Sequence, residues 1–150
     1  MTNLSDAIKQ QNFKDSKHKA YLNILYTSNW LRDKFNPIFK EYNILAQHYN
    51  VMRIVRGRKG EPVSPGDIID VMLDKGRDLT RLVDKLVKLD YLERQTCEHN
   101  RRKVEIFITD LGLQVTQNIQ EKINVIMNNE LNISEKEADQ LSDLLDNLRG

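Results

Sequence analysis

The chain of 150 residues has one cysteine, Cys97, and no apolar run of the roughly 18 residues that a membrane-spanning helix needs. A single cysteine excludes a disulfide framework within the chain, which favours a reducing compartment. The N-terminal residues, MTNLSDAIKQQ, contain no apolar signal core, so we expect no secretion. Together these absences predict a soluble, cytoplasmic protein with no membrane partner.

Catalytic and cofactor motifs are also missing. The sequence has no glycine-rich loop followed by Lys-Ser or Lys-Thr, and no serine or cysteine lies in a recognisable nucleophile context. The histidines, His18, His48 and His99, are far apart and lack the spacing of a metal site. We therefore expect no enzyme activity, no cofactor and no metal. His48 is interpreted as a packed or hydrogen-bonded residue, and Cys97 as a small apolar filler rather than a redox sensor.

Cationic side chains are concentrated in the middle of the sequence, although the net charge of the whole chain is only +1. Residues 53–103 carry thirteen Lys and Arg against nine Asp and Glu, whereas residues 104–150 carry three against nine. The acidic C-terminal third therefore conceals a positive middle. A positive surface there meets the electrostatic requirement for binding phosphates.

Apolar periodicity predicts a mainly α protein with one pair of short strands. Residues 15–41 indicate a long helix that is apolar, and therefore buried, on more than one side, and Pro37 is expected to kink or end it. The further elements are a helix over 44–56, a short helix from the Ser64 cap to about Leu73, a helix over 76–90, two strands joined by a polar tip over 98–102, a helix over 110–129 and a last helix after a capping box at Ser134. This order is typical of a winged helix-turn-helix with long helices on either side.

The helix predicted over 76–90 has one apolar and one basic face. Its outer face carries Arg77, Thr80, Arg81, Asp84, Lys85 and Lys88. Such a helix fits the major groove of DNA, where the fork of an arginine can form two hydrogen bonds with guanine. Arg77 and Arg81 are expected one turn apart in the N-terminal half, which normally reaches the bases. An ordinary amphipathic surface helix is the alternative interpretation.

Two smaller features could contact the same duplex. Arg101, Arg102 and Lys103 lie at the predicted hairpin tip, where arginine suits the negative potential of a narrow minor groove. Ser64 caps a short helix whose free backbone N–H groups could meet a phosphate. The tip alone is also consistent with a solvated loop, and the four cations within 53–59 with a charged loop that keeps the protein soluble. Recognition helix and tip together favour double-stranded DNA as the partner.

Residues 43–112 contain the stretch LTRLVDKL over 79–86 and the stretch ITDLG over 108–112. With these motifs the segment resembles the MarR family of bacterial transcription regulators. LTRLVDKL resembles the family's recognition helix and is the most specific match, while ITDLG is similar to the family's Leu-Thr-x-x-Gly signature. Segments similar to the second helix, the third helix and the entry into the wing are residues 47–55, 64–68 and 90–94.

The sequence departs from the family pattern at two positions. The wing usually carries Asp-x-Arg, and here the stretch is Asn100-Arg101-Arg102. The match assigns the minor-groove role to Arg102, whereas Asn100 replaces an acidic residue that helps to hold the wing in the family. Leu45 stands where the family often has a capping Thr or Ser, and Asn43 could cap two residues earlier.

The resemblance implies an obligate homodimer. Residues 1–42 and 110–150 would be dimerisation helices, and residues 43–109 the DNA-binding core. The apolar surface expected outside the core agrees, because it needs a partner to cover it; packing within one chain is the alternative. The implied function is a sequence-specific regulator, a repressor, on a pseudo-palindromic operator. A small apolar ligand between dimer arm and core would change the spacing of the reading heads, although an effector-free protein stays open. The competing hypothesis is a winged-helix module that binds an acidic protein and has no DNA role.

Overall fold

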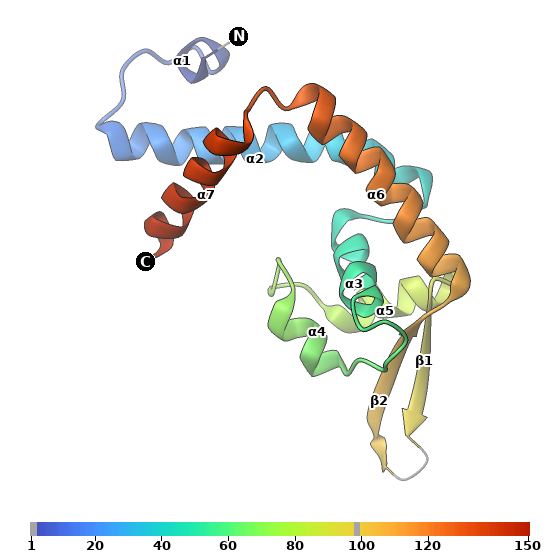
Figure 1. The fold of residues 1–150 in the computed structure, drawn as a ribbon. Helices are drawn as coiled ribbons and strands as arrows, with labels where there is room; N and C mark the ends of the chain where they lie inside the picture. Colours follow the sequence, from blue (N-terminus) through green and yellow to red (C-terminus); the bar gives the residue numbers. More distant parts are fainter. Residues whose placement is uncertain (1–2, 98–99) are drawn as a thin grey trace.

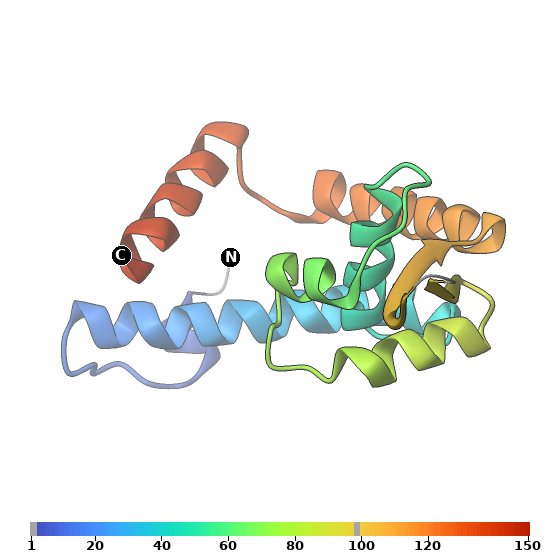
Figure 2. The same cartoon turned by 90° about the horizontal axis from the view of Figure 1, so that it is seen from below.

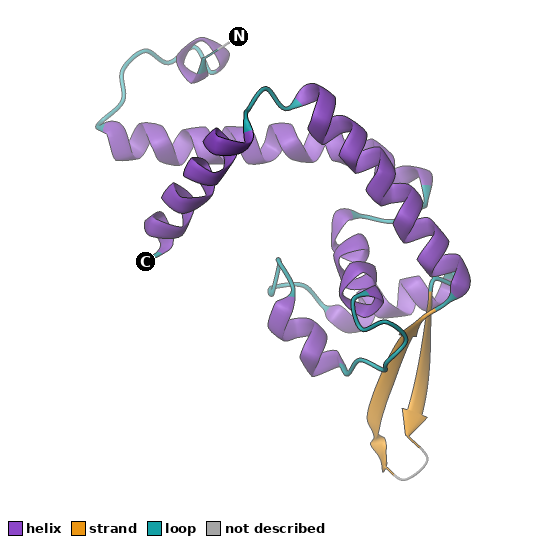
Figure 3. Ribbon diagram, viewed as in Figure 1, coloured by secondary structure: helices purple, strands orange, loops and turns teal. Residues whose placement is uncertain are grey.

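The computed structural model describes residues 3–97 and 100–150, without the side chains of residues 97–102. Its elements are α1 (Leu4–Ala7), α2 (Ser16–Glu41), α3 (Ala46–Arg56), α4 (Pro65–Val71), α5 (Leu79–Lys88), β1 (Leu92–Cys97), β2 (Asn100–Ile108), α6 (Asp110–Glu130) and α7 (Glu135–Arg149). The predicted mainly α class with a two-stranded wing is confirmed, and Figure 3 shows the wing projecting from the helices. Helix α1 was not predicted, because a single turn is too short to show a periodic pattern.

The helix ends follow local capping rules at most positions. The side chains of Asp15, Ser64, Thr109 and Ser134 accept hydrogen bonds from backbone N–H groups in the first turns of α2, α4, α6 and α7. Pro37 does not end α2, which continues to Glu41 because Ile38 and Phe39 are buried against the core. None of the described helices has the length and apolar content to cross a membrane.

The start of α3 is capped by an unexpected residue. Leu45 occupies the N-cap position and cannot accept a hydrogen bond, but the His48 Nδ1 atom accepts one from the Leu45 backbone N–H at 3.1 Å. The predicted alternative cap, Asn43, is wrong, because this residue lies in the left-handed region (φ 57°) and its side chain contacts Lys85 instead. The expectation for His48 is confirmed: the residue is buried and hydrogen-bonded. Burial, and secondly the charge of Lys85, lowers the pKa of the imidazole.

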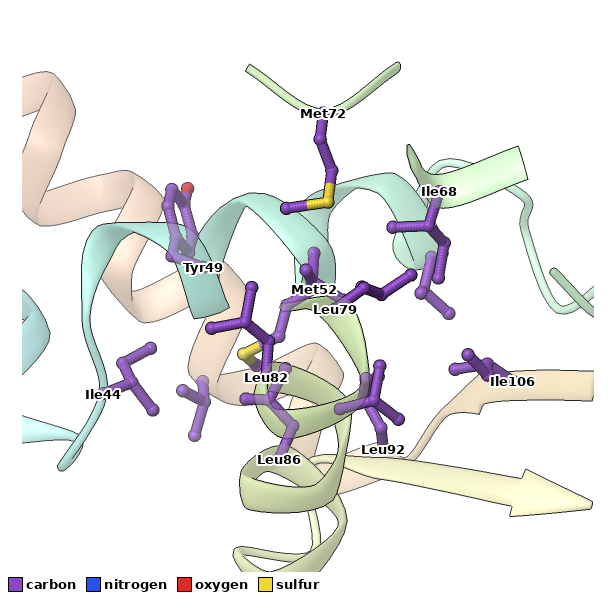
Figure 4. Packing of buried hydrophobic residues seen from close by; sticks show 14 of the residues in the cluster. Ile44, Tyr49, Met52, Ile68, Met72, Leu79, Leu82, Leu86, Leu92 and Ile106 are labelled. Carbon is purple, nitrogen blue, oxygen red and sulfur yellow. The ribbon is translucent and has the colours of Figure 1, made fainter. Parts of the chain in front are cut away.

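One apolar core joins the helices to the base of the wing (Figure 4). Its fully buried members include Met52, Ile68, Leu86, Leu92, Ile106 and Ile119. The strands pair antiparallel from Leu92 opposite Ile108 to Cys97 opposite Asn100. Val63 adds a bridge to the outer edge, since it exchanges two backbone hydrogen bonds of 3.0 and 2.9 Å with Ile106. The wing is therefore anchored to the loop that leads into α4.

Packing at the exit from the wing explains the glycine of the 108–112 signature. The Thr109 hydroxyl donates to the Asp90 carbonyl at 2.6 Å and accepts from the Gly112 N–H at 2.9 Å. A Cβ atom on Gly112 would lie 2.0 Å from the Tyr91 carbonyl oxygen. No side chain fits there without moving the backbone, so the start of α6 and the turn before β1 are held together.

Helix α2, the C-terminal half of α6 and α7 extend beyond the core, and we call them the arm (Figures 1 and 2). Helix α2 packs along α6 in the arm, with the ion pairs Lys34–Glu130 and Glu41–Lys122 between them. In the described chain α7 has no buried residue and lies apart from the core.

Candidate nucleic-acid interface

Helix α5 presents a polar outer face because its apolar residues point into the core. Leu79, Leu82, Val83 and Leu86 are buried, while Thr80 and Arg81 are exposed. The Arg81 side chain is 88% exposed, and its Nε atom lies 3.2 Å from the Asp78 carboxylate. Such an exposed pair contributes little free energy, so Arg81 can exchange it for a ligand.

A groove of about 400 Å³ runs beside this outer face. Its lining residues are Asn43, Arg81, Asp84, Lys85, Lys88 and Leu89. The Lys85 Nζ atom donates to the Asn43 side-chain oxygen at 3.4 Å, which orients the lysine along the groove. Three cations and one carboxylate therefore share a concave surface that suits a polyanion.

Arg77 lies outside the recognition helix, which corrects the sequence prediction. The helix was expected from residue 76, but Asp78 is its N-cap and accepts from the Arg81 N–H at 3.3 Å. Arg77 occupies the preceding turn, where its Nε atom is 2.9 Å from the Asp74 carboxylate. Arg77 and Arg81 are thus not neighbours on one helix face, because a capping aspartate excludes the first of them.

Ser64 and Lys103 lie near one another although 39 positions separate them in the sequence. Ser64 and Asp67 form a capping box at α4. Hydrogen bonding to the Ser64 side chain, then to its backbone N–H, lowers the pKa of the Asp67 carboxyl, and the charges of Arg58 and Lys103 act in the same direction. The bridge between Val63 and Ile106 is what brings the α4 loop to β2. Lys103 itself is exposed, 3.7 Å from the Glu105 carboxylate.

The predicted wing tip, residues 98–102, is only partly described. The pairing of Cys97 with Asn100 places the backbone of Arg101 and Arg102 in β2, so the loop is shorter than expected. A strand extends further than sequence patterns indicate when its polar residues continue the backbone ladder. Glu98 and His99, and the side chains of Arg101 and Arg102, lie outside the described residues.

An ion pair that sequence reasoning missed joins α5 to the wing. The Arg94 Nη2 atom, on β1, lies 2.8 Å from the Asp84 Oδ1 atom. The nine residues between them carried no signal for the contact, because part of a helix, a turn and part of a strand intervene.

A second groove, of about 530 Å³, lies where the arm meets the core. Its lining includes Phe35 and Phe39 from α2, Tyr49 from α3, Leu73 from the α4–α5 turn, and Ile123 and Met127 from α6. The Tyr49 hydroxyl hydrogen-bonds to the Gln120 side chain at 3.1 Å across this junction. The groove is largely apolar, with a few polar groups, as in sites for small organic molecules.

The core, the exposed basic α5 and the projecting hairpin define a winged helix-turn-helix protein. Over 135 residues the chain is 38% identical to the HTH-type transcriptional regulator SarZ of Staphylococcus aureus, covering 89% of this chain and 86% of that protein. The chain thus belongs to the MarR family of winged helix-turn-helix transcriptional regulators. A scan of protein-family models finds no match.

Solved structures share the same fold. A mutant MarR of E. coli, complexed with operator DNA, superposes with a TM-score of 0.70 at 20% identity and covers 98% of this chain and 99% of that one. The organohalide-sensing regulator RdhR, in its 2,4-dichlorophenol-bound form, gives 0.80 at 14% identity and covers 99% and 88%.

Proposed function

We propose that this protein is a sequence-specific regulator that binds duplex DNA in the cytoplasm and acts as a homodimeric repressor on a pseudo-palindromic operator. The observation that carries the proposal is that α5 and the cationic strand β2 arise from one packed core. Such a core keeps a recognition helix and a wing at a constant separation, which adjacent grooves of one duplex require. The operator complex of MarR, a protein of the same fold, supports this assignment.

Each predicted site residue takes a distinct role in the proposal. Arg81 contacts a base edge in the major groove, with Thr80 and Lys85 beside it. Arg102 enters the minor groove, and Arg101 and Lys103 contact the backbone near it. Ser64 and Arg77 contact phosphates from the loops before α4 and α5, and these contacts position the protein without reading sequence.

The homodimer is supported by apolar side chains that the single chain leaves uncovered. They are Tyr21, Ile24, Leu25, Tyr26 and Trp30 on α2 and Leu141, Leu144 and Leu148 on α7, each at least 36% exposed. Soluble chains rarely expose so many large apolar side chains on two helices without a partner. We assign residues 1–42 and 110–150 to dimerisation and residues 43–109 to DNA binding. Two cores would then meet two half-sites of a near-palindrome.

The groove between α2, α3 and α6 suits a small aromatic effector. It lies between the proposed dimer arm and the reading core, where a wedged ligand would change the separation of the two recognition helices. The dichlorophenol complex of RdhR supports a phenolic or similarly apolar ligand. DNA affinity that falls on addition of 2,4-dichlorophenol would support this part of the proposal.

The main experiment measures binding to duplexes selected from a random pool, by fluorescence anisotropy at several salt concentrations. We expect Arg102→Ala to weaken binding to most sequences and to reduce the salt slope by about one, because it removes from the minor groove a cation that neutralises phosphate charge. Arg81→Ala should also relax sequence preference, by about 1–3 kcal/mol at one base pair. Lys136→Ala is the control, since this exposed cation lies in the first turn of α7, outside the residues assigned to the duplex and to the apolar face of the dimer.

The competing function is a winged-helix module for an acidic protein partner. The exposed cations of α5 would serve either partner, so duplex affinity and its salt dependence are the measurements that separate the two functions. If neither alanine variant changes duplex affinity or its salt slope, the DNA proposal is wrong and the protein-binding function is favoured.

A further inference from the structure

The contact between Arg94 and Asp84 joins the two elements that the proposed function uses to read DNA. Arg94 lies on β1 and Asp84 on the outer side of α5, with 2.8 Å between Nη2 and Oδ1. Both side chains are about 40% exposed (39% and 41%), so the pair borders the surface rather than the core. The backbone at Arg94 is held in place, because it pairs with Ile106, which in turn bridges to Val63.

Asp84 places a negative charge on a helix face whose other charged residues are cations. Helix α5 has the sequence LTRLVDKLVK, in which Asp84 is the one acid among three cations. Its side chain lines the groove that Arg81, Lys85 and Lys88 also line. A bare carboxylate at this place would face the phosphates of a duplex and repel them. By pairing with Asp84, Arg94 neutralises the negative charge and fixes the direction of the carboxylate.

The composition of the wing gives this pair additional importance. The position at which MarR proteins usually have an acidic residue is Asn100 in this chain, so it offers no carboxylate to anchor an arginine. Among the described residues, Arg94–Asp84 is the ion pair that connects the wing to α5.

We propose that Arg94 is a positioning residue for DNA recognition: by pairing with Asp84 it neutralises the acid on the recognition helix and holds the wing in register with that helix. The proposal rests on the proposed function, because it assigns Arg94 a role in duplex binding. It differs from a phosphate contact, in which Arg94 itself would touch DNA and Asp84 would only weaken the contact.

A double-mutant cycle that removes each charge in turn distinguishes a positioning role from a direct phosphate contact. Arg94→Gln, Asp84→Asn and the double variant are compared with the unmodified protein on a selected duplex and on a random one. We expect Arg94→Gln to bind the selected duplex about tenfold more weakly, because Asp84 is left bare, and the double variant to return to within about threefold of the unmodified protein. The ratio of selected to random affinity should fall in Arg94→Gln and recover in the double variant.

Two outcomes overturn the proposal. A double variant as weak as Arg94→Gln, together with an Asp84→Asn variant that binds more tightly, would show that Arg94 contacts phosphate directly. Equal affinities for all four proteins would show that the pair has no part in recognition. Melting temperatures serve as the folding control, and if Arg94→Gln is unfolded, the reversed pair Asp84→Arg with Arg94→Asp replaces it, with recovery of affinity expected.

The same experiment distinguishes failure of the proposed function. If the unmodified protein selects no duplex and Arg81→Ala changes nothing, both proposals fail together. If the unmodified protein binds and Arg81→Ala weakens it, while the cycle shows no coupling, only the role of Arg94 is wrong.

Discussion

The apolar core and the arm of this protein differ in how much of their apolar surface a single chain buries. In the core, fully buried residues come from α3, α4, α5, both strands and the first half of α6. Its buried polar residues, His48 and Thr116, each form a hydrogen bond. In the arm, α2 buries only Ile38 and Phe39 among 26 residues, and in the described chain α7 buries none. The core is therefore buried within one chain, whereas the arm leaves large apolar side chains exposed that the proposed dimer would cover.

The largest expected effect on the free energy of unfolding is a break in the core at Gly112. The Cβ atom of Gly112→Ala would lie 2.0 Å from the Tyr91 carbonyl oxygen, which forces the start of α6 away from the turn before β1. We expect a loss of about 3 kcal/mol in the free energy of unfolding, the upper part of the usual range for overpacking. Urea denaturation measures it. Gly66→Ala is the control, because the nearest described atom to its Cβ would be the Ser64 Oγ at 3.8 Å; an equal loss in both variants would contradict the packing argument.

The arm should respond to substitution through association rather than through folding of the core. Leu144→Glu with Leu148→Glu removes two side chains that are 67% and 66% exposed in the single chain. If a partner buries them, each contributes about 2 kcal/mol to association, so sedimentation should show a shift from dimer to monomer. Val71→Glu, at a 59% exposed position of α4 outside the arm and the groove, should leave the dimer intact. A double variant that stays dimeric would disprove this interface.

The junction between arm and core can be weakened by removing one hydroxyl. Tyr49→Phe loses the hydrogen bond to Gln120 at 3.1 Å, which links α3 with α6. We expect stability to fall by about 1 kcal/mol, the usual net value of such a bond. Gln117→Ala serves as the control, since this exposed side chain of α6 hydrogen-bonds to Glu121 within the same helix. Thermal denaturation of both variants tests the prediction. Equal melting temperatures would show that the hydrogen bond between Tyr49 and Gln120 does not stabilise the fold.

The smallest expected effect is a pH dependence that comes from the cap of α3. The pKa of His48 is lowered in the folded chain from the ordinary value of 6.5, first by burial and then by Lys85. Its stabilising contribution is therefore complete above pH 6.5 and is lost as pH falls towards the folded pKa, since the unfolded chain takes up the proton first. His48→Gln should show a flatter stability curve between about pH 7 and 5. An unchanged slope, measured by urea denaturation, would show that other groups dominate.

Sequence patterns predicted the parts of the fold that depend on neighbouring residues. Ser64, Thr109 and Ser134 act as caps because a side-chain oxygen meets N–H groups three residues ahead. The apolar spacing of Leu79, Leu82 and Leu86 identified the recognition helix, because residues three and four positions apart share one helix face. Its start was placed too early, because Arg77 belongs to an amphipathic pattern that the Asp78 cap interrupts.

Contacts between distant segments could not be predicted in this way. Val63 lies in a loop of the sequence but joins the edge of the sheet, and His48 replaces a cap that the sequence does not provide. The pairing of Arg94 with Asp84 depends on the angle at which β1 leaves α5. Each depends on backbone geometry that only the packed core creates.

The amino-acid order alone determined the order of helices and strands of a winged helix-turn-helix, because helical periodicity, capping residues and turns act over a few positions. Membership of the MarR family came from the likeness of its motifs to those of known regulators. The tertiary structure decided which charges face one another around the recognition helix and which apolar faces the single chain leaves uncovered. Those properties depend on the distance between side chains in space, and folding sets that distance independently of their separation along the chain.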